Sequence, residues 1–145
     1  MNLLLEKLRP LGFNDRPLTE TDFHRICEAE HIEIVWSDTK FSFYFSAFGL
    51  SCITLPKRLR GLRLLFAMYH ELAHHFLHAG KQPSVLWLKM PHENGKEETE
   101  ADALACIALI PKRDLGKFGI LDEYPRGFAK KIYNDRLRIY FLFGV

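Results

Sequence analysis

Residues 62–79 read LRLLFAMYHELAHHFLHA and form the most regular amphipathic stretch of the chain. Apolar residues recur there at spacings of three and four, as a helix with one wide buried face requires. They are Leu62, Leu65, Phe66, Tyr69, Leu72, Ala73, Phe76 and Leu77. Gly80 suits the end of the helix, because glycine readily adopts the left-handed conformation that often follows the last turn. The stretch therefore predicts a long helix packed against a core.

The same helix carries an H-E-x-x-H motif, His70-Glu71-Leu72-Ala73-His74. Residues four apart lie on one helix face, one turn above each other, so His70 and His74 can close on one metal ion. Glu71 follows the first of these ligands and can take a proton from a water on the metal. We therefore predict metal ligation by His70 and His74 and general-base catalysis by Glu71.

Two more histidines lie on this helix. His78 points roughly the same way as His74, but two turns carry it about 12 Å along the axis from His70. It is expected at the rim of the site or in contact with the ligands, and not on the same ion. His75 lies about 100° around the helix and is expected to be structural or exposed.

A catalytic zinc ion takes three protein ligands, so one more must come from outside this helix. Residues 97–110 predict a second helix, and the loop before it is long enough for this helix to fold back across the first. Glu100 is the predicted third ligand, because it begins a run of small and apolar residues that suit close packing on the His70 helix. Asp102 is predicted to accept a hydrogen bond from a ligand histidine and to fix its tautomer.

Other polar residues in this region are weaker candidates. His92, in the loop between the two helices, is an alternative ligand. Glu97 and Glu98 are interpreted as a solvated first turn, where negative charge suits the positive end of the helix dipole. Tyr44, Tyr69 and His92 are the candidates for stabilising the transition state.

The predicted fold class is α+β, with a small antiparallel three-stranded sheet packed against a helical bundle that contains the HExxH helix. Strands are expected over 32–36, 41–46 and 51–55, joined by links too short for parallel crossovers. Further helices are expected from Thr19 to about Glu30 and over 126–143. The last helix is expected to expose Lys130, Lys131, Arg136 and Arg138.

Composition narrows the classes of protein. The 145 residues argue for one domain over 1–145, with an N-terminal segment and loop over 1–19. A net charge of +2 is too balanced for a dedicated nucleic-acid binder. Three widely spaced cysteines fit reduced thiols, and neither a secretory signal nor a membrane span is evident. A cytoplasmic protein with no membrane contact is expected.

The motifs resemble the ImmA/IrrE family of metallopeptidases. That family shows HELGHxLLH and, a couple of dozen residues later, EA[N/D]xFAAxLLMP. This chain has HELAHHFLH from His70 and EADALACIALIP from Glu100, and the likeness spans about residues 30–140. The glutamate that opens the second motif is the family's third zinc ligand, which falls on Glu100. Ala73, Leu104 and Cys106 replace the family's glycine, phenylalanine and alanine.

The resemblance implies a zincin-like fold of the gluzincin type and a zinc-dependent endopeptidase that cleaves a DNA-binding repressor, plausibly of the helix-turn-helix type. One Zn²⁺ per chain is expected, although two histidines and a carboxylate also suit iron(II), cobalt or manganese. Many relatives carry an additional helix-turn-helix or sensor domain, and this sequence contains no such segment. Direct nucleic-acid binding is therefore not expected.

Three alternatives stay open. A catalytically idle zinc-binding module would bind a regulator without cutting it, but Glu71 has no structural role in a zinc site. A site like that of peptide deformylases would use Cys52, because Gly49-Leu50-Ser51-Cys52 is similar to their EGCLS motif. That motif's glutamate is missing, however, and only 17 residues separate Cys52 from His70. A redox switch at Cys106 is less favoured than a small buried thiol.

Overall fold

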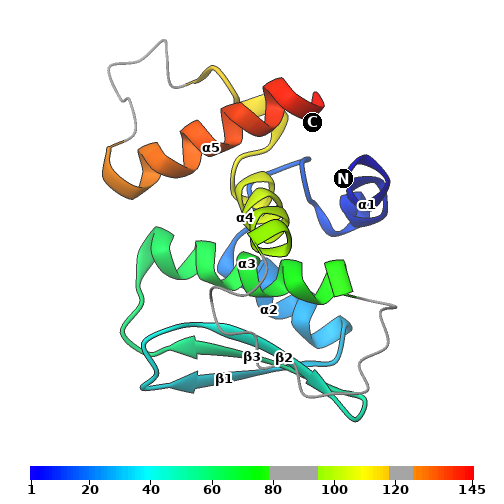
Figure 1. The fold of residues 1–145 in the computed structure, drawn as a ribbon, viewed down its shortest axis with the longest axis vertical. Helices are drawn as coiled ribbons and strands as arrows, with labels where there is room; N and C mark the ends of the chain where they lie inside the picture. Colours follow the sequence, from blue (N-terminus) through cyan, green and yellow to red (C-terminus); the bar gives the residue numbers. More distant parts are fainter. Residues whose placement is uncertain (79–94, 118–125) are drawn as a thin grey trace.

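The structure is a computed structural model that describes residues 1–78, 95–117 and 126–145. The described helices and strands follow one another in a fixed order (Figure 1). They are α1 (Asn2–Leu8), the short 3₁₀ helix η1 (Arg9–Leu11), α2 (Glu20–Ala29), β1 (Ile32–Ser37), β2 (Phe43–Ala47), β3 (Leu50–Pro56), α3 (Gly61–His78), α4 (Gly95–Leu109), the 3₁₀ helix η2 (Lys112–Asp114) and α5 (Gly127–Phe143). The α+β class is confirmed.

The three strands form a mixed sheet in the order β1-β3-β2. β2 and β3 form an antiparallel hairpin, whereas β1 runs parallel to β3. The prediction of a purely antiparallel sheet is therefore wrong for one of the two strand pairs. It assumed that consecutive strands pair, but residues 38–49, which include β2, together connect β1 to β3. This connection is about a dozen residues long, which is enough for a parallel crossover.

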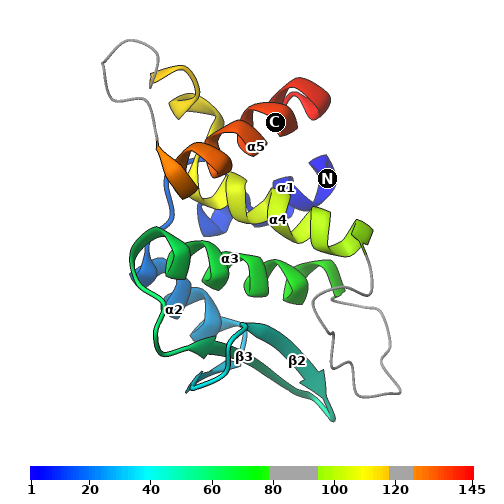
Figure 2. The same ribbon diagram turned by 60° about the vertical axis from the view of Figure 1, so that its left-hand side comes forward.

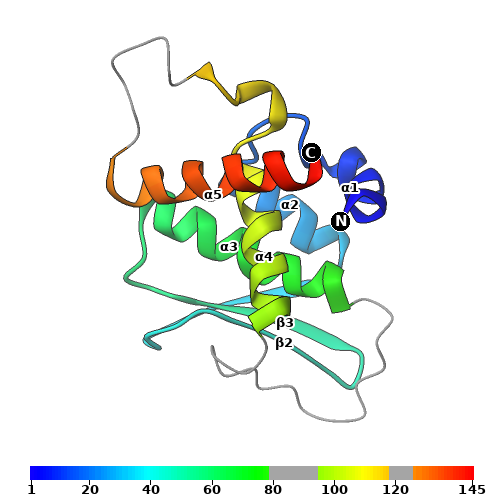
Figure 3. The same cartoon turned by 45° about the horizontal axis from the view of Figure 1, so that its top comes forward.

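All the described helices lie on one side of the sheet (Figures 1 and 2). α3 packs on β2 and β3, α2 packs on β1 and α3, and α4 lies across α3 on the side away from the sheet. α5 packs on α4 and forms the outermost layer (Figure 3). None of the helices in the described ranges is long and apolar enough to cross a membrane.

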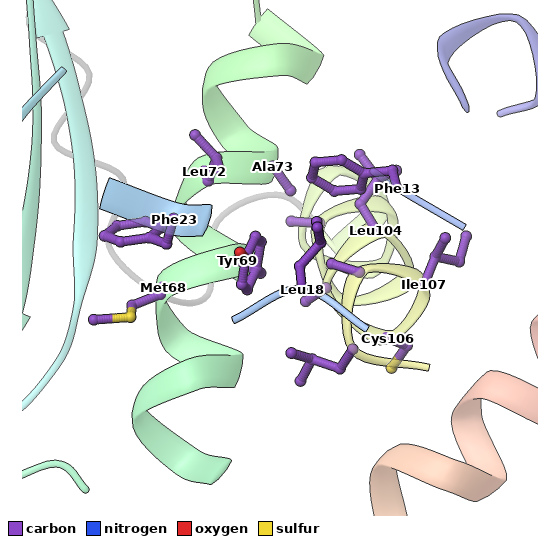
Figure 4. Packing of buried hydrophobic residues seen from close by; sticks show 14 of the residues in the cluster. Phe13, Leu18, Phe23, Met68, Tyr69, Leu72, Ala73, Leu104, Cys106 and Ile107 are labelled. Atoms are coloured by element: carbon purple, nitrogen blue, oxygen red, sulfur yellow. The ribbon is translucent and has the colours of Figure 1, made fainter. Parts of the chain in front are cut away.

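The crossing of α3 and α4 is the centre of the core. The α4 side of the contact is made of small residues, and Ala101, Ala105 and Ala108 are fully buried there. Their size lets the two helix backbones approach closely. Leu18 and Tyr69 fill the space between the helices (Figure 4), and both are at most 2% exposed. Any group that α4 presents to α3 is thereby held in a fixed position.

The N-terminal segment is more ordered than the sequence suggests. It adds α1 and η1 and then enters α2 through a capping box, in which Thr19 accepts from the Asp22 amide and Asp22 accepts from the Thr19 amide. The Tyr69 hydroxyl donates to the Thr19 carbonyl at 2.7 Å. This hydrogen bond ties the start of α2 to the middle of α3.

Arg136 corrects the expectation of a solvated basic face on α5, because its side chain is fully buried. Its guanidinium donates to the main-chain oxygens of Ile110 and Val145 and to the side-chain oxygen of Asn14, at 2.6–3.1 Å. Burial lowers the pKa of Arg136. One side chain thus joins the end of α4, the end of α5 and the N-terminal segment.

We predict that Arg136→Ala lowers the free energy of unfolding by about 3 kcal/mol, since three acceptors lose a charged donor. Urea denaturation followed by circular dichroism measures the loss. Arg138→Ala, on the exposed side of the same helix, is the matched control and should change stability by no more than about 0.5 kcal/mol. Equal effects of the two substitutions would contradict the bridging role of Arg136.

Candidate metal centre

His70 and His74 lie one turn apart in the C-terminal half of α3. Their Nε2 atoms are 3.2 Å apart, and the side chains are only 15% and 6% exposed. α3 is anchored on one side by the sheet and on the other by α4, so both imidazole rings are held by packing. The two nitrogens therefore face one common point at the surface between α3 and α4.

The third group at this point is Glu98, from the first turns of α4. Its Oε2 lies 3.1 Å from His70 Nε2, and its Oε1 lies 3.3 Å from His74 Nε2. In the described ranges, these three residues are the group whose ligand atoms lie within 4.8 Å of one another and could hold a metal ion. Glu98 thus stands where the sequence analysis expected Glu100.

Helix geometry explains this difference. Each residue turns a helix by about 100°, so Glu100 is about 200° around from Glu98 and faces away from the histidines. Asp102, four residues after Glu98, shares its face. The four-residue spacing between Glu98 and Asp102 is the signal in the sequence that points to Glu98 as the residue on the histidine side of this helix.

Asp102 lies where its predicted role requires. Its Oδ1 is 2.8 Å from His70 Nδ1, which donates the hydrogen bond and leaves Nε2 to face Glu98 and His74. Burial lowers the pKa of His70, but the hydrogen bonds to Asp102 and Glu98 raise it more, to about 10. The two carboxylates thus create a strong local preference for a positive charge.

The donor set fits a zinc ion. In a tetrahedral site with bonds of about 2.0–2.1 Å, ligand atoms lie about 3.3–3.4 Å apart. The Nε2 atoms of His70 and His74 are 3.2 Å apart, close to that spacing. One Glu98 oxygen lies 3.1 Å from His70 Nε2, and the other lies 3.3 Å from His74 Nε2. Two imidazole nitrogens and a carboxylate all present lone pairs to one point, which is favourable only with a cation or a shared proton between them.

Glu71 lies on the side of these histidines that faces the sheet. Its side chain is buried, and Ser42 donates to its Oε1 at 2.7 Å. The amide of Tyr44 also donates to the Glu71 carboxylate. Burial raises the pKa of Glu71 and the charge on His70 opposes this, so the carboxyl group holds a proton more readily than an ordinary glutamate. A raised pKa suits a group that must both accept and donate a proton.

The contact of Ser42 with Glu71 could not be predicted from the sequence, because Ser42 precedes β2 and only the folded chain brings it to α3.

His75 lies one turn beyond Glu71, on the same side of α3. It contacts the Tyr44 hydroxyl through Nδ1 at 3.0 Å and Glu30 through Nε2 at 3.1 Å. His75 is therefore structural, as expected, and links β2 to the end of α2.

The remaining candidates do not join the centre. The Tyr69 side chain is buried and its hydroxyl donates to the Thr19 carbonyl, so it is unsuited to stabilise a transition state. Cys52 is on β3, outside the group formed by the two histidines and Glu98. Cys106 is buried, and burial raises its pKa to about 12, which disfavours the reactive thiolate. The side chain of His78 and all of His92 lie outside the described residues.

Comparison with known proteins now assigns the family. The model of the M78 peptidases, described as the IrrE N-terminal-like domain, matches residues 27–118. This is more than half of the chain and includes both α3 and α4, so the chain belongs to that family, whose domain is of the metallopeptidase type. The family predicted from the two motifs is thus confirmed. Neither the comparison with curated proteins nor that with solved structures found a match.

We predict that Glu98→Gln weakens zinc binding at least about 100-fold, since it removes an anionic ligand. Glu100→Gln, two residues away, should leave the affinity within about three-fold, because Glu100 faces away from the two histidines. Competition with a chromophoric chelator measures both affinities. The opposite order would restore Glu100 as the ligand.

Zinc binding is predicted to release about one proton per chain at pH 7, because His70, with its raised pKa, must lose a proton to become a ligand. The affinity should therefore rise about ten-fold per pH unit between pH 6 and 8. Titration calorimetry in buffers of different ionisation enthalpy counts the protons. Asp102→Asn should reduce the number released, and an affinity that is flat above pH 7 in the wild-type protein would contradict the raised pKa.

Proposed function

We propose that this member of the IrrE N-terminal-like family is a zinc-dependent endopeptidase of the gluzincin type. The observation that carries the proposal is the convergence of His70, His74 and Glu98 beside a buried Glu71 that other residues hold in place. The HExxH helix supplies two ligands and the base, and the next helix supplies the third ligand, as in a zincin-like site.

A zinc ion held by these three residues would act as a Lewis acid toward the scissile carbonyl and make a water more acidic. Glu71 accepts the proton of the attacking water through its carboxylate and then delivers it to the leaving amine. Ser42 and the Tyr44 amide hold the Glu71 carboxylate during both transfers. Asp102 holds the Nδ1 proton of His70, so that Nε2 keeps its lone pair for the metal.

The substrate is proposed to bind as an extended peptide along β2. β2 is an edge strand that pairs with β3 among the described residues, so its other edge can accept a further strand. Ser42 and Tyr44 connect this strand directly to Glu71, so a peptide added to β2 lies close to the base. Recognition through main-chain hydrogen bonds requires a segment that is extended or locally unfolded.

The proposed substrate is a helix-turn-helix repressor, and the proposed compartment is the cytoplasm, where such repressors act. Both follow from the resemblance described above. To test the activity, zinc-loaded protein and its Glu71→Gln variant are each incubated with a proteome extract, and newly formed N-termini are labelled and sequenced. We expect new N-termini within a repressor with the wild-type protein alone. Capture of the repressor without cleavage by either protein would favour the idle binding module.

We predict that Glu71→Gln keeps one zinc ion per chain and abolishes cleavage, because the amide cannot accept the proton of the attacking water. Metal content comes from elemental mass spectrometry, and cleavage comes from the labelled N-termini. Cleavage by this variant at the wild-type rate would remove Glu71 from the mechanism.

Ser42→Ala is predicted to lower kcat about ten-fold, the kinetic equivalent of losing a hydrogen bond of about 1.5 kcal/mol to a charged group. Zinc content and KM should stay unchanged, because Ser42 touches neither the ligands nor the proposed strand-pairing edge. Ser42→Thr keeps a hydroxyl and should retain activity. Ser46→Ala is the matched control, since Ser46 lies on β2, the strand that Ser42 precedes, but contacts Ser51 at 3.4 Å. An inactive control would indicate general damage to β2.

A further inference from the structure

The sheet has an apolar face that no described helix covers. Successive side chains along a strand point to opposite faces of the sheet. The side chain of Tyr44, which contacts His75, points to the face that the helices cover. The neighbouring residues of β2 therefore point to the opposite side, together with those of the other strands that pair with them. In the strands, this outer face consists of Glu33, Val35, Ser37, Phe43, Phe45, Ala47, Leu50, Cys52 and Thr54, and Phe41, two residues before Phe43, extends it.

In an isolated domain, the apolar residues of such a strand would face the helices and its polar residues would face solvent. The strand β2 and the residues just before it show the opposite pattern. Polar Ser42, Tyr44 and Ser46 turn toward α3, where the proposed base lies, so the phenylalanines that alternate with them must turn outward. Val35, Phe41 and Leu50 are 41%, 55% and 71% exposed. The helices that contact the sheet, α2 and α3, are both on its other side (Figures 1 and 2). An apolar group of this kind marks a contact surface.

An acidic and a basic residue lie near opposite ends of β1 at this outer face. Glu33 pairs with Cys52 in the register, so it is on the outer face toward the start of β1, and it is exposed. Lys40 lies beyond the other end of β1, exposed, with its Nζ 5.4 Å from the centre of the Phe41 ring. The nearby Asp38 lies 3.8 Å from Lys57, and among the described residues no carboxylate forms an ion pair with Lys40.

We propose that the outer face binds a second copy of this chain, in a two-fold symmetric dimer with the two sheets face to face. A two-fold axis across the strands sets the strands of the two copies antiparallel. The phenylalanines of one copy then pack on those of the other, and Glu33 of each copy lies on the side of Lys40 of its mate. This self-complementarity is what an interface between identical surfaces requires. The edge of β2 that pairs with no described strand lies outside this contact between the two sheets.

The size of the face sets the strength of the association. Three strands of five to seven residues cover about 20 Å by 14 Å, roughly a third of the area that each partner buries in a standard interface, so the association is expected to be weak and reversible. The dissociation constant is therefore expected on the order of 10–100 μM, and the experiment must reach several hundred micromolar.

Sedimentation equilibrium of the full chain between 5 and 500 μM, from about two-fold below to about five-fold above that range, tests the proposal. The wild-type protein should pass from monomer to dimer, and Phe45→Ser should raise the dissociation constant at least ten-fold. Phe141→Ser is the matched control, because Phe141 is 79% exposed on α5, on the opposite side of the molecule from the sheet. It should leave the constant within two-fold.

A charge exchange avoids any doubt about folding, because both residues are exposed. Glu33→Lys and Lys40→Glu should each weaken the dimer at least three-fold, and the double variant should return to within two-fold of wild type. A protein that stays monomeric at 500 μM, the top of the tested range, would overturn the proposal and leave the face for a different protein. A dimer that Phe141→Ser breaks and the sheet variants do not would overturn it as well.

Discussion

The structure depends on one close contact, the crossing of α3 and α4. Small residues on α4, Ala101, Ala105 and Ala108, allow it, and α3 contributes the buried residues on which they pack. The same crossing brings Glu98 and Asp102 to His70 and His74. A larger side chain at any of the three alanines would separate the helices and the ligands together. Core packing and the candidate metal centre thus depend on one interface.

The centre is built with different supports on its two sides. Toward α4, carboxylates surround the histidines and raise the pKa of His70, which gives the site its preference for a cation. Toward the sheet, Glu71 is buried and held by Ser42, so its pKa is raised as well. The raised pKa of His70 and the raised pKa of Glu71 have different consequences. The effect on His70 ends when a cation displaces its proton, whereas the effect on Glu71 suits the proton transfer proposed for it between water and a leaving amine.

Much of this arrangement could be predicted from the sequence, because helical periodicity is local. The histidines on α3, the capped start of α2 and the position of Asp102 all follow from spacing within single helices. Strand order, the burial of Arg136 and the contact between Ser42 and Glu71 could not be predicted, because each depends on segments far apart in the chain. Glu98 is intermediate, since the choice between it and Glu100 required the rotation of α4 about its axis.

X-ray absorption at the zinc edge tests the central claim most directly. Protein purified without chelators and loaded with zinc should show two imidazole nitrogens and carboxylate or water oxygens at about 2.0–2.1 Å, with no sulfur. The Glu98→Gln variant should lose zinc or change this spectrum, and the Glu100→Gln variant should match the wild type. A sulfur ligand at about 2.3 Å, or failure of the wild-type protein to retain zinc, would contradict a centre made of His70, His74 and Glu98.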